Sequence, residues 1–564
     1  MSKNKPRLLP IGISDFKTII DGNYAYADKS LLIQELVERG VHVALIPRPR
    51  RFGKTLNLSL LRYFFEKTTE DTSYLFKGLK IWEHESYRAL QGQFPVITLS
   101  LKDVKHATWE ETYGAICSVI AREFERHRSI LTVLSENEKP IYQEIASGKG
   151  GASLVEQSLL RLSEWLHRLY GKKVVLLIDE YDTPAHAAYI GNYYDTFIGF
   201  IRNWLSAGLK DNIYLERGVL TGILRIAKES IFSGLNNVGT FTLLNKEFQD
   251  KFGLLEEEVK ELLEDRGLVD RLPSIMEWYD GYRIGSCTGL HNPWSVLTCI
   301  SKDGDLAPYW VNTSDNALMK RLIARGGDDL KMDVEELLKG HVIEKTVDEG
   351  IVFSELEQSS TAVWSLLLYC GYLTLDAPPV DDVPCKLKIP NIEVGRLYRT
   401  MISGWFSTTL QESKYRYLLS SLTSGDIDTF SYLFQEFMAS SASAFDIPFE
   451  ESEKIYHVFV LGMLVGLRDQ YEIKSNRESG FGRYDVMLIP KDKNGLGIIM
   501  EFKKIRPHEK IDLEKAVTLA LKQIEDKHYA QDLLDAGVTN ILYLGLAFEG
   551  KNVLIRSKYH GVTP

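Results

Sequence analysis

The segment Gly53-Lys54-Thr55 lies between an apolar run and an amphipathic run, and this junction constrains the fold more than any other part of the chain. Residues 41–46 are apolar and include β-branched side chains, which predicts a buried strand. Residues 55–66 carry apolar side chains at helical spacing. A short turn from a buried strand into a helix is typical of α/β folds, because parallel strands need helical crossovers.

Three more apolar runs follow, and helical segments lie between them. The runs cover residues 94–99, 174–178 and 212–220. Residues 108–126 and 154–170 have helical periodicity. Strands that alternate with helices over roughly 200 residues predict a mostly parallel α/β sheet.

The Gly53-Lys54-Thr55 segment also has the residue types that bind a nucleotide phosphate. In a phosphate-binding loop, backbone N–H groups surround the phosphates, a lysine bridges them and a hydroxyl residue binds Mg²⁺. The full motif opens with a glycine, but Arg48 stands at that position here. Because a glycine there permits unusual backbone angles, we expect a loop that is wider or differently shaped.

An acidic pair, Asp179 and Glu180, follows the apolar run 174–178. A carboxylate at the end of such a strand can reach the Mg²⁺ shell, and a glutamate next to it can orient a water for attack on the γ-phosphate. The alternative is that Lys54 caps an ordinary turn and the two acids lie on a surface loop. The order of the two motifs along the chain favours a nucleotide site.

Basic and hydroxyl residues near these motifs extend the candidate site. Arg50 and Arg51, like Arg48, either bind phosphates or form ion pairs at the surface. Thr221 follows the fourth apolar run. It either senses the γ-phosphate, together with Arg225 just after it, or caps a helix. We count Arg50, Arg51 and Thr221 among the candidate cofactor-binding residues.

A second candidate site lies near the C-terminus, where Asp485 opens a β-run and Glu501 and Lys503 flank Phe502 in a later run. Two acids on adjacent strands can hold Mg²⁺ against a phosphodiester. A lysine two residues after the second acid lies on the same face of its strand. Asp485, Glu501 and Lys503 are therefore catalytic candidates for phosphodiester hydrolysis. The alternative is a solvated hairpin face with a Glu–Lys pair.

Two neighbouring segments have alternative roles at this second site. Glu453 begins an amphipathic segment and either adds a metal ligand or places a charge at a helix N-terminus. Gln523 and residues 527–529 either contact a phosphate backbone or cap and pack a helix, and the structural role is favoured.

The composition excludes several classes of protein. A net charge of −10 counts against a chain that coats nucleic acid through bulk electrostatics, although a local basic groove stays open. No window approaches about eighteen uninterrupted apolar residues, and no signal-peptide cleavage site follows the N-terminus, so no membrane span is expected. The five cysteines form no CxxC pair. This argues against a zinc site or a disulfide framework and favours a cytoplasmic location.

Several motifs together give the chain a family resemblance, and they span nearly its whole length. The N-terminal and middle motifs resemble the bacterial AAA-ATPase-like proteins, and the C-terminal ones resemble the PD-(D/E)XK nuclease domain commonly fused to them. The motifs are Tyr26-Ala27-Asp28-Lys29-Ser30, Arg48 to Thr55, Ile178-Asp179-Glu180-Tyr181-Asp182, Thr221-Gly222 with residues 231–236, Trp278-Tyr279-Asp280-Gly281-Tyr282, Asn292-Pro293-Trp294-Ser295, Tyr456-His457, Gly482-Arg483-Tyr484-Asp485 and Glu501-Phe502-Lys503.

The resemblance implies which residues bind the cofactors. It places ATP and Mg²⁺ at Lys54, Thr55 and Asp179, and a nuclease metal at Asp485 and Glu501. An arginine at the opening of the phosphate-binding loop is usual in that family. Tyr484 replaces the proline of the nuclease motif, which is tolerated because the proline is not a ligand.

At 564 residues the chain is too long for one hydrophobic core. We expect an α/β multidomain protein with an AAA-like P-loop core over residues 1–235, whose parallel sheet is followed by a helical lid over 236–345. A mixed, mainly helical connecting region over 346–445 and a PD-(D/E)XK-type α/β domain over 446–564 complete it. Small residues at 440–443 suggest the last boundary.

The leading functional hypothesis is an ATP-regulated, Mg²⁺-dependent nuclease, in defence or in mobile-element biology. Its expected partner is nucleic acid, with DNA favoured over RNA and no membrane, and a homo-oligomer stays open. A second hypothesis is an ATP-dependent switch or scaffold whose nuclease-like domain only binds nucleic acid or a protein partner. A third is a chain whose altered loop binds no nucleotide.

Overall fold

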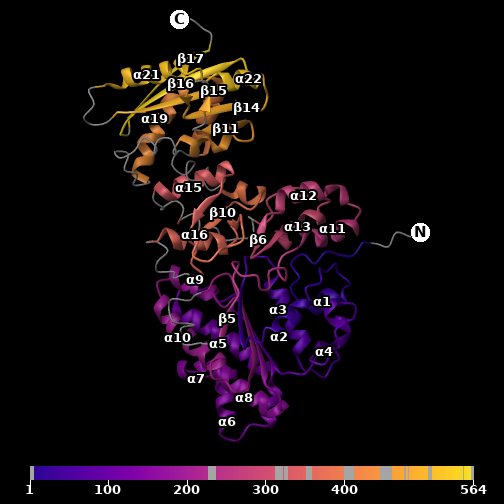
Figure 1. The fold of residues 1–564 in the computed structure, drawn as a ribbon. Coiled ribbons are helices and arrows are strands. Elements are labelled where there is room, and N and C mark those ends of the chain that lie inside the picture. The colour runs from indigo at the N-terminus through magenta and orange to yellow at the C-terminus, as the bar shows by residue number, and fades with distance from the viewer. Residues whose placement is uncertain are drawn as a thin grey trace. The chain divides into compact units, whose positions relative to one another are not determined.

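The structure is a computed structural model that describes residues 6–225, 237–310, 322, 328–350, 359–398, 400, 412–444, 460–475, 478–479, 482–505, 511–550 and 552–560. The chain divides into two compact units. Unit 1 contains Met1–Ser314 and Val342–Val394, and unit 2 contains Asp315–His341 and Gly395–Pro564. Figure 1 labels the elements of both units.

Unit 1 begins with alternating helices and strands. Its elements up to the fifth strand are α1 (Phe16–Asp21), α2 (Leu31–Glu38), β1 (Val43–Pro47), α3 (Lys54–Phe65), α4 (Glu85–Arg88), β2 (Val96–Ser100), α5 (Trp109–Arg126), α6 (Glu138–Ala146), α7 (Ala152–Glu156), α8 (Ser158–Tyr170), β3 (Val174–Asp179), α9 (Thr183–Ile190), α10 (Tyr194–Leu209), β4 (Leu215–Gly222) and β5 (Val238–Thr240).

These strands form one parallel sheet in the order β2-β3-β4-β1-β5, which confirms the predicted parallel α/β sheet. Every residue of β1 and β3 is buried, which explains why both strands read as uninterrupted apolar runs. β4 lies between β1 and β3, so that Thr221 pairs with Ile46 on one side while Leu220 pairs with Ile178 on the other. The carboxyl ends of these three strands therefore meet at one edge of the sheet.

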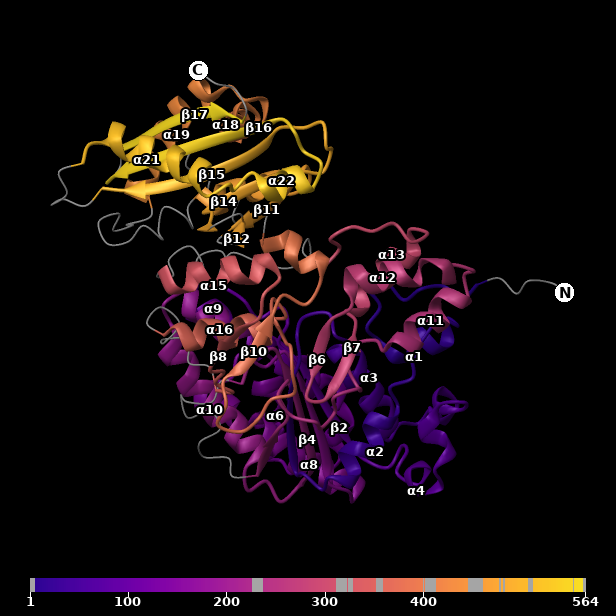
Figure 2. The same ribbon diagram turned by 45° about the horizontal axis from the view of Figure 1, so that its top comes forward.

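Helices cover both faces of this sheet (Figures 1 and 2). α1 packs with α3 on one side. On the other side α5 contacts α10 through Trp109 and Phe200, and α8 through Phe124 and Trp165. The sheet is thus the middle layer of three, with its core between apolar helix faces and buried strands.

The rest of unit 1 is a helical lid followed by a small three-stranded sheet in the order β8-β10-β9. The lid helices share a core that includes Val259, Ile275, Tyr279 and Val296. The elements are α11 (Glu256–Glu264), α12 (Leu272–Tyr279), the hairpin strands β6 (Tyr282–Ile284) and β7 (Cys287–Leu290), α13 (Pro293–Ser301), β8 (Ile343–Lys345), α16 (Ser360–Tyr369), β9 (Thr374–Leu375) and β10 (Cys385–Lys388).

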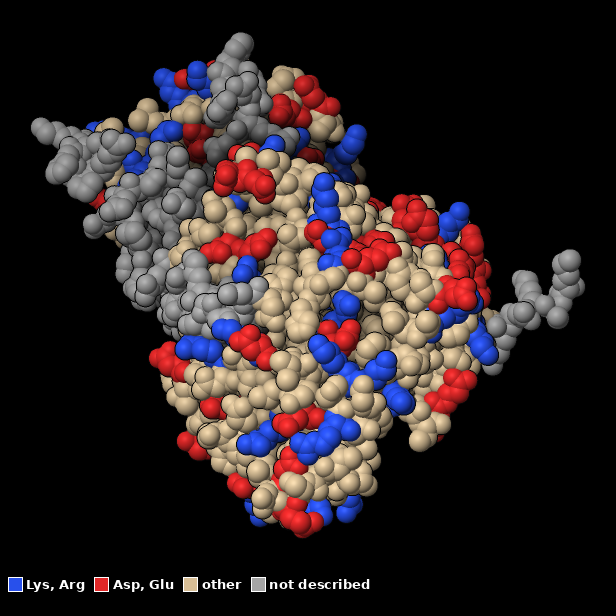
Figure 3. All heavy atoms as spheres, turned by 60° about the horizontal axis from the view of Figure 1, so that its bottom comes forward, with Lys and Arg blue, Asp and Glu red and all other residues tan. Residues whose placement is uncertain are grey.

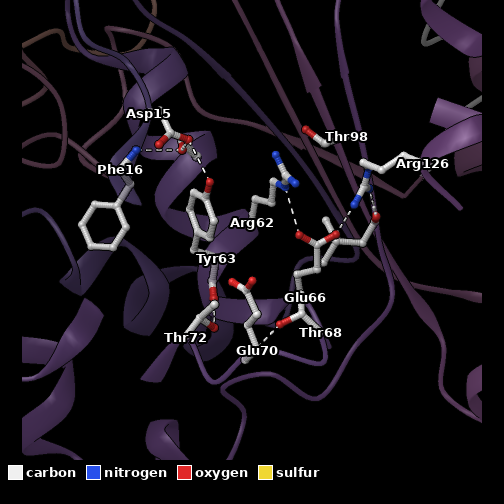
Figure 4. A network of polar contacts seen from close by, with 12 residues as sticks. Asp15, Phe16, Arg62, Tyr63, Glu66, Thr68, Glu70, Thr72, Thr98 and Arg126 are labelled. Atoms are coloured by element: carbon white, nitrogen blue, oxygen red, sulfur yellow. Dashed lines mark hydrogen bonds and ion pairs between the residues drawn. The ribbon is translucent and has the colours of Figure 1, made fainter. Parts of the chain in front are cut away.

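A buried ionic network fixes the C-terminal end of α3, the helix that begins at Lys54 (Figure 4). Glu66 accepts hydrogen bonds from Arg62 and from Arg126 of α5. Arg126 also donates to Glu123, whose carboxylate accepts the backbone N–H of Thr98 in β2. The network therefore ties α3 and α5 to the sheet.

We expect Arg126→Met to lower the free energy of unfolding of unit 1 by about 3–5 kcal/mol, because it leaves Glu66 and Glu123 buried with fewer partners. The control is Lys139→Met, which breaks an ion pair whose side chains are 39% and 88% exposed and is expected to cost less than about 1 kcal/mol. Urea unfolding of both variants measures the difference. Equal losses would show that the network contributes nothing beyond a surface pair.

The same network has an expected pH dependence. Burial alone would raise the pKa of Glu123, but hydrogen bonds from Arg126 and His127 lower the pKa to about 2. A lowered folded-state pKa contributes stability above the unfolded value near 4.5, and this stability is lost as the pH falls toward 2. The acid-induced loss of stability is therefore expected to be smaller in the Arg126→Met variant.

Unit 2 contains the C-terminal sheet and several helices. Its elements are α15 (Asp328–Lys339), α18 (Glu412–Ser424), α19 (Ile427–Ala444), β11 (Tyr471–Ser475), β12 (Glu478–Ser479), β13 (Gly482–Arg483), β14 (Val486–Pro490), β15 (Gly497–Lys504), α21 (Leu513–Asp526), α22 (Gln531–Asp535), β16 (Ile541–Glu549) and β17 (Asn552–Tyr559).

The five-stranded sheet of unit 2 has the order β11-β14-β15-β16-β17. β15 and β16 are parallel, with α21 between them in the chain, and the other neighbours are antiparallel. This arrangement confirms the predicted C-terminal α/β domain. One detail of the prediction is wrong: Asp485 does not open the strand but immediately precedes β14.

The apolarity of the helices and the surface charge both agree with the composition. Within the ranges that the structure describes, no helix is both long enough and apolar enough to span a membrane. On the face shown in Figure 3, basic and acidic side chains are interspersed. A face of this kind does not provide the continuous positive potential that draws nucleic acid to a surface.

Candidate nucleotide and metal sites

The β1–α3 loop, residues 48–53, brings the chain from the middle of the parallel sheet into α3. Gly53 precedes α3 with φ = 84°, and Arg51 also has a positive φ of 67°. A Cβ added at Gly53 would meet no atom within 4 Å, so glycine is favoured there by its backbone conformation and not by lack of space. The loop thus contains two left-handed residues within three positions.

Arg48 is fully buried, and the expectation that it binds phosphate or forms a surface ion pair is wrong. Its guanidinium donates to the backbone carbonyls of Pro47, Phe241, Glu247 and Phe248 and lies over the ring of Phe252. The side chain therefore joins the start of the loop to the segment that leads into the lid. This gives a structural reason for an arginine where the full motif has glycine.

Asp179, at the end of β3, bonds to the start of α3 and to the end of β4. Its Oδ2 accepts a hydrogen bond of 2.6 Å from the Thr55 hydroxyl, and its Oδ1 accepts one of 2.7 Å from the Thr221 hydroxyl. Glu180 follows with φ = 50° and accepts a hydrogen bond from Thr183. A threonine hydroxyl beside a carboxylate is a donor set suited to Mg²⁺, so these residues fit the ion that the motif implies.

Lys54 lies near enough to Glu180 and Asp179 for their charges to act on it. Its ammonium donates to the carbonyls of Arg48 and Pro49, both at 3.0 Å. Burial lowers the pKa of Lys54, whereas the charges of Glu180, Asp179 and Asp182 oppose the change. The structure thus brings together the loop lysine and the acidic residues that the sequence analysis paired.

Residues of the lid also contact the β1–α3 loop. Asn292 donates to the Arg50 carbonyl at 3.2 Å, and the Trp294 ring lies 4.3 Å from the Arg51 guanidinium carbon. Tyr282 packs edge-on against Phe52. Sequence reasoning noted the motifs that hold these residues but assigned none of them to the loop.

The second site lies at the start of β14 and along β15. Asp485 Oδ2 accepts the backbone N–H of Phe502 at 2.7 Å, which holds this acid next to the middle of β15. Glu501 is only 2% exposed, and its Oε1 accepts a 3.0 Å hydrogen bond from Lys503. Asp485, Glu501 and Lys503 are therefore together in space.

The Glu501 carboxylate is poorly satisfied. Its Oε2 is buried and has no hydrogen-bond partner among the described residues. Burial, followed by the negative charge of Asp485, raises the pKa of Glu501 to about 8. A divalent cation between the two acids would supply the missing partner and offset the repulsion, so the site fits a metal.

The other candidates of unit 2 contribute less to this site. Glu453 lies outside the described residues, and within those residues no group of three or more His, Cys, Asp or Glu side chains is arranged to hold a metal. Gln523 donates to the Tyr529 hydroxyl, and Tyr529 packs on Tyr484 in the core. These contacts support the structural role that the sequence favoured for Gln523 and Tyr529.

Comparison with known proteins identifies two domain families in the chain. Residues 10–232 match the family model of a predicted AAA-ATPase, and residues 451–558 match that of the PD-(D/E)XK nuclease superfamily. An uncharacterized protein in the vnfD 5′ region of Azotobacter chroococcum mcd 1 is 27% identical over 578 residues, which cover 97% of each chain. A Walker-type ATPase of Pyrococcus abyssi is 14% identical with a TM-score of 0.35, over 71% of this chain and 100% of that one. The chain therefore carries an AAA-ATPase-like domain followed by a domain of the PD-(D/E)XK nuclease superfamily, as its motifs predicted.

Proposed function

We propose that this protein binds and hydrolyses ATP and couples the nucleotide cycle to a Mg²⁺-dependent nuclease domain that cleaves phosphodiester bonds. One observation carries the proposal: each unit holds a buried acid beside a lysine, Asp179 near Lys54 and Glu501 at 3.0 Å from Lys503. Such pairs provide both a cation ligand and a positive charge for a phosphate.

At the first site, each residue has a distinct role in the proposed reaction. Lys54 and the backbone around Gly53 bind the phosphates, and Thr55 and Asp179 hold Mg²⁺, which neutralises the developing charge when it is bound. Glu180 orients the attacking water, and Thr221 reports the state of the γ-phosphate to Asp179. Arg50 and Arg51 lie in the same loop and supply positive charge to the phosphates.

At the second site, Asp485 and Glu501 hold the cation and Lys503 positions the attacking water. Lys503 is 29% exposed, whereas Glu501 is buried, so the lysine can meet a substrate from solvent while the acid faces the ion. The proposed substrate is nucleic acid, with DNA favoured over RNA. A cytoplasmic role in defence or in mobile-element biology, and self-association during the cycle, are part of the same proposal.

The test is cleavage of plasmid and single-stranded DNA by the full chain with Mg²⁺ or Mn²⁺, with and without ATP. We expect nicked or linear product from the wild type and none from Asp485→Ala. Asp526→Ala, which removes an exposed acid of the same unit, is the matched control and should cleave normally. Equal cleavage by wild type and Asp485→Ala would point to a contaminating nuclease and refute the proposal.

A second candidate function is an ATP-dependent switch or scaffold whose nuclease-like domain only binds nucleic acid or a protein partner. The net charge of −10 and the interspersed charges of Figure 3 favour it, because an enzyme that processes long nucleic acids gains from a continuous basic surface. This function predicts ATP binding that changes the oligomeric state without any cut product. Light scattering with and without ATP, alongside the cleavage assay, separates the two.

A further inference from the structure

The two residues after the acidic pair, Tyr181 and Asp182, bond to the segment that follows β4. Asp182 Oδ2 accepts the backbone N–H groups of Ile223 at 2.9 Å and of Leu224 at 2.8 Å. The Tyr181 hydroxyl donates to the Leu224 carbonyl at 2.7 Å. These hydrogen bonds thus join the end of β3 to the residues just after Thr221.

The Asp182 carboxylate fits this place closely. The residue is 5% exposed, and its Oδ1 is buried without a hydrogen-bond partner among the residues that the structure describes. A Cβ added at Gly222 would lie 2.4 Å from that oxygen. The carboxylate can therefore reach the two N–H groups only because residue 222 has no side chain.

The segment from Thr221 to Arg225 has a candidate group of the nucleotide site at each end. Thr221 donates to Asp179 at one end, and Arg225 follows Leu224 at the other. Arg225 lies 3.7 Å from Glu349, a long ion pair between side chains that are about one-third exposed. Such a pair contributes little and leaves the guanidinium able to exchange its partner for a phosphate.

We propose that Asp182 is a positioning residue of the ATPase site, which holds Thr221 and Arg225 in the geometry that meets the γ-phosphate opposite Glu180. This role rests on the proposed ATP hydrolysis. Asp182 acts through backbone N–H groups and does not touch the nucleotide. Its loss should therefore slow hydrolysis while nucleotide binding through Lys54 and Thr55 remains.

The experiment compares Asp182→Ala, Asp182→Asn and Gly222→Ala in the full chain, with Kd for Mg²⁺-ATP and kcat measured separately. We expect Asp182→Ala to lower kcat by about 10- to 100-fold, because a displaced catalytic group costs about that much, with Kd changed less than threefold. Asp182→Asn keeps an oxygen that can accept both N–H groups, so its kcat should be within about threefold of wild type. Gly222→Ala displaces the carboxylate and should resemble Asp182→Ala.

The control is Asp195→Ala, which removes an exposed acid on α10 and should change neither constant. The inference is overturned if Asp182→Ala hydrolyses ATP like the wild type, or if the asparagine variant is as slow as the alanine variant. If Asp182→Ala does not fold, Gly222→Ala and Asp182→Asn still decide the outcome. If the wild type binds no ATP, the proposed function itself is overturned. If the wild type hydrolyses ATP and Asp182→Ala is equally active, only the role of Asp182 is overturned.

Discussion

Replacing Asp179 with asparagine is expected to lower kcat for ATP hydrolysis by about 100- to 1,000-fold, the cost of removing a charged group that stabilises the transition state. Asp179 accepts hydrogen bonds from both Thr55 and Thr221, and it ends the strand next to β4. The asparagine side chain is of the same size, but it carries no negative charge to bind Mg²⁺. Its NH₂ group also cannot accept a hydrogen bond from a threonine hydroxyl. A phosphate-release assay at saturating Mg²⁺-ATP measures the loss.

The same variant should lose ligand-induced stabilisation but not its fold. A ligand present at 100 times its Kd stabilises the folded state by about 2.7 kcal/mol, which appears as a rise in Tm. We expect this rise in the wild type and in Asp195→Asn, and a much smaller rise in Asp179→Asn. Unchanged hydrolysis by Asp179→Asn would show that Asp179 does not bind the magnesium ion. A Tm rise equal to that of the wild type would show that Asp179 does not contribute to nucleotide binding.

Replacing Glu501 with glutamine is expected to abolish metal-dependent cleavage while it stabilises the metal-free protein. The Glu501 carboxyl is buried beside Asp485, and these two causes raise its pKa to about 8. A folded-state pKa above the unfolded value near 4.5 gives stability below pH 4.5 that is lost as the pH rises through 8. In EDTA at pH 8.5, Glu501→Gln should therefore be more stable than the wild type by about 2 kcal/mol.

Thermal unfolding in EDTA at pH 6 and pH 8.5, and again with Mg²⁺, tests this prediction. The wild type should lose stability between the two pH values and regain it with Mg²⁺, whereas Glu501→Gln should respond weakly to both. The control is Glu525→Gln, which removes an exposed partner of Lys558 and should follow the wild type. A destabilised Glu501→Gln at pH 8.5 in EDTA would show that the ion pair with Lys503 outweighs the burial of the charge and its repulsion by Asp485.

The parts of the fold that the sequence predicts are those with a local signal. β1 and β3 are buried on both faces, so every residue except the terminal Asp179 is apolar and the runs stand out. The motif order then places Lys54 and Asp179 at the same edge of the sheet, because parallel strands end at one edge. The sequence does not predict β17, since an edge strand with exposed Asn552, Arg556 and Ser557 has only a short apolar run.

The parts that could not be predicted depend on contacts between distant residues. Nothing near Arg48 in the sequence indicates that carbonyls at 241 and 247–248 surround its guanidinium. The contact between Trp294 and Arg51 likewise joins positions more than 200 residues apart. The sequence also gives no sign of the role proposed for Asp182, because a carboxylate that bonds backbone N–H groups has the same sequence signal as one that binds a metal.

The buried guanidinium at position 48 has a consequence for protein engineering. An arginine-to-glycine exchange there would complete the standard phosphate-loop motif, and a designer guided by consensus would regard it as a repair. In this chain it would instead leave the carbonyls of Pro47, Phe241 and Phe248 without their donor and free the start of the loop. The glycine variant, which matches the general motif, is thus expected to be less active than the wild type. A match to the consensus motif is therefore a poor guide to activity in this fold.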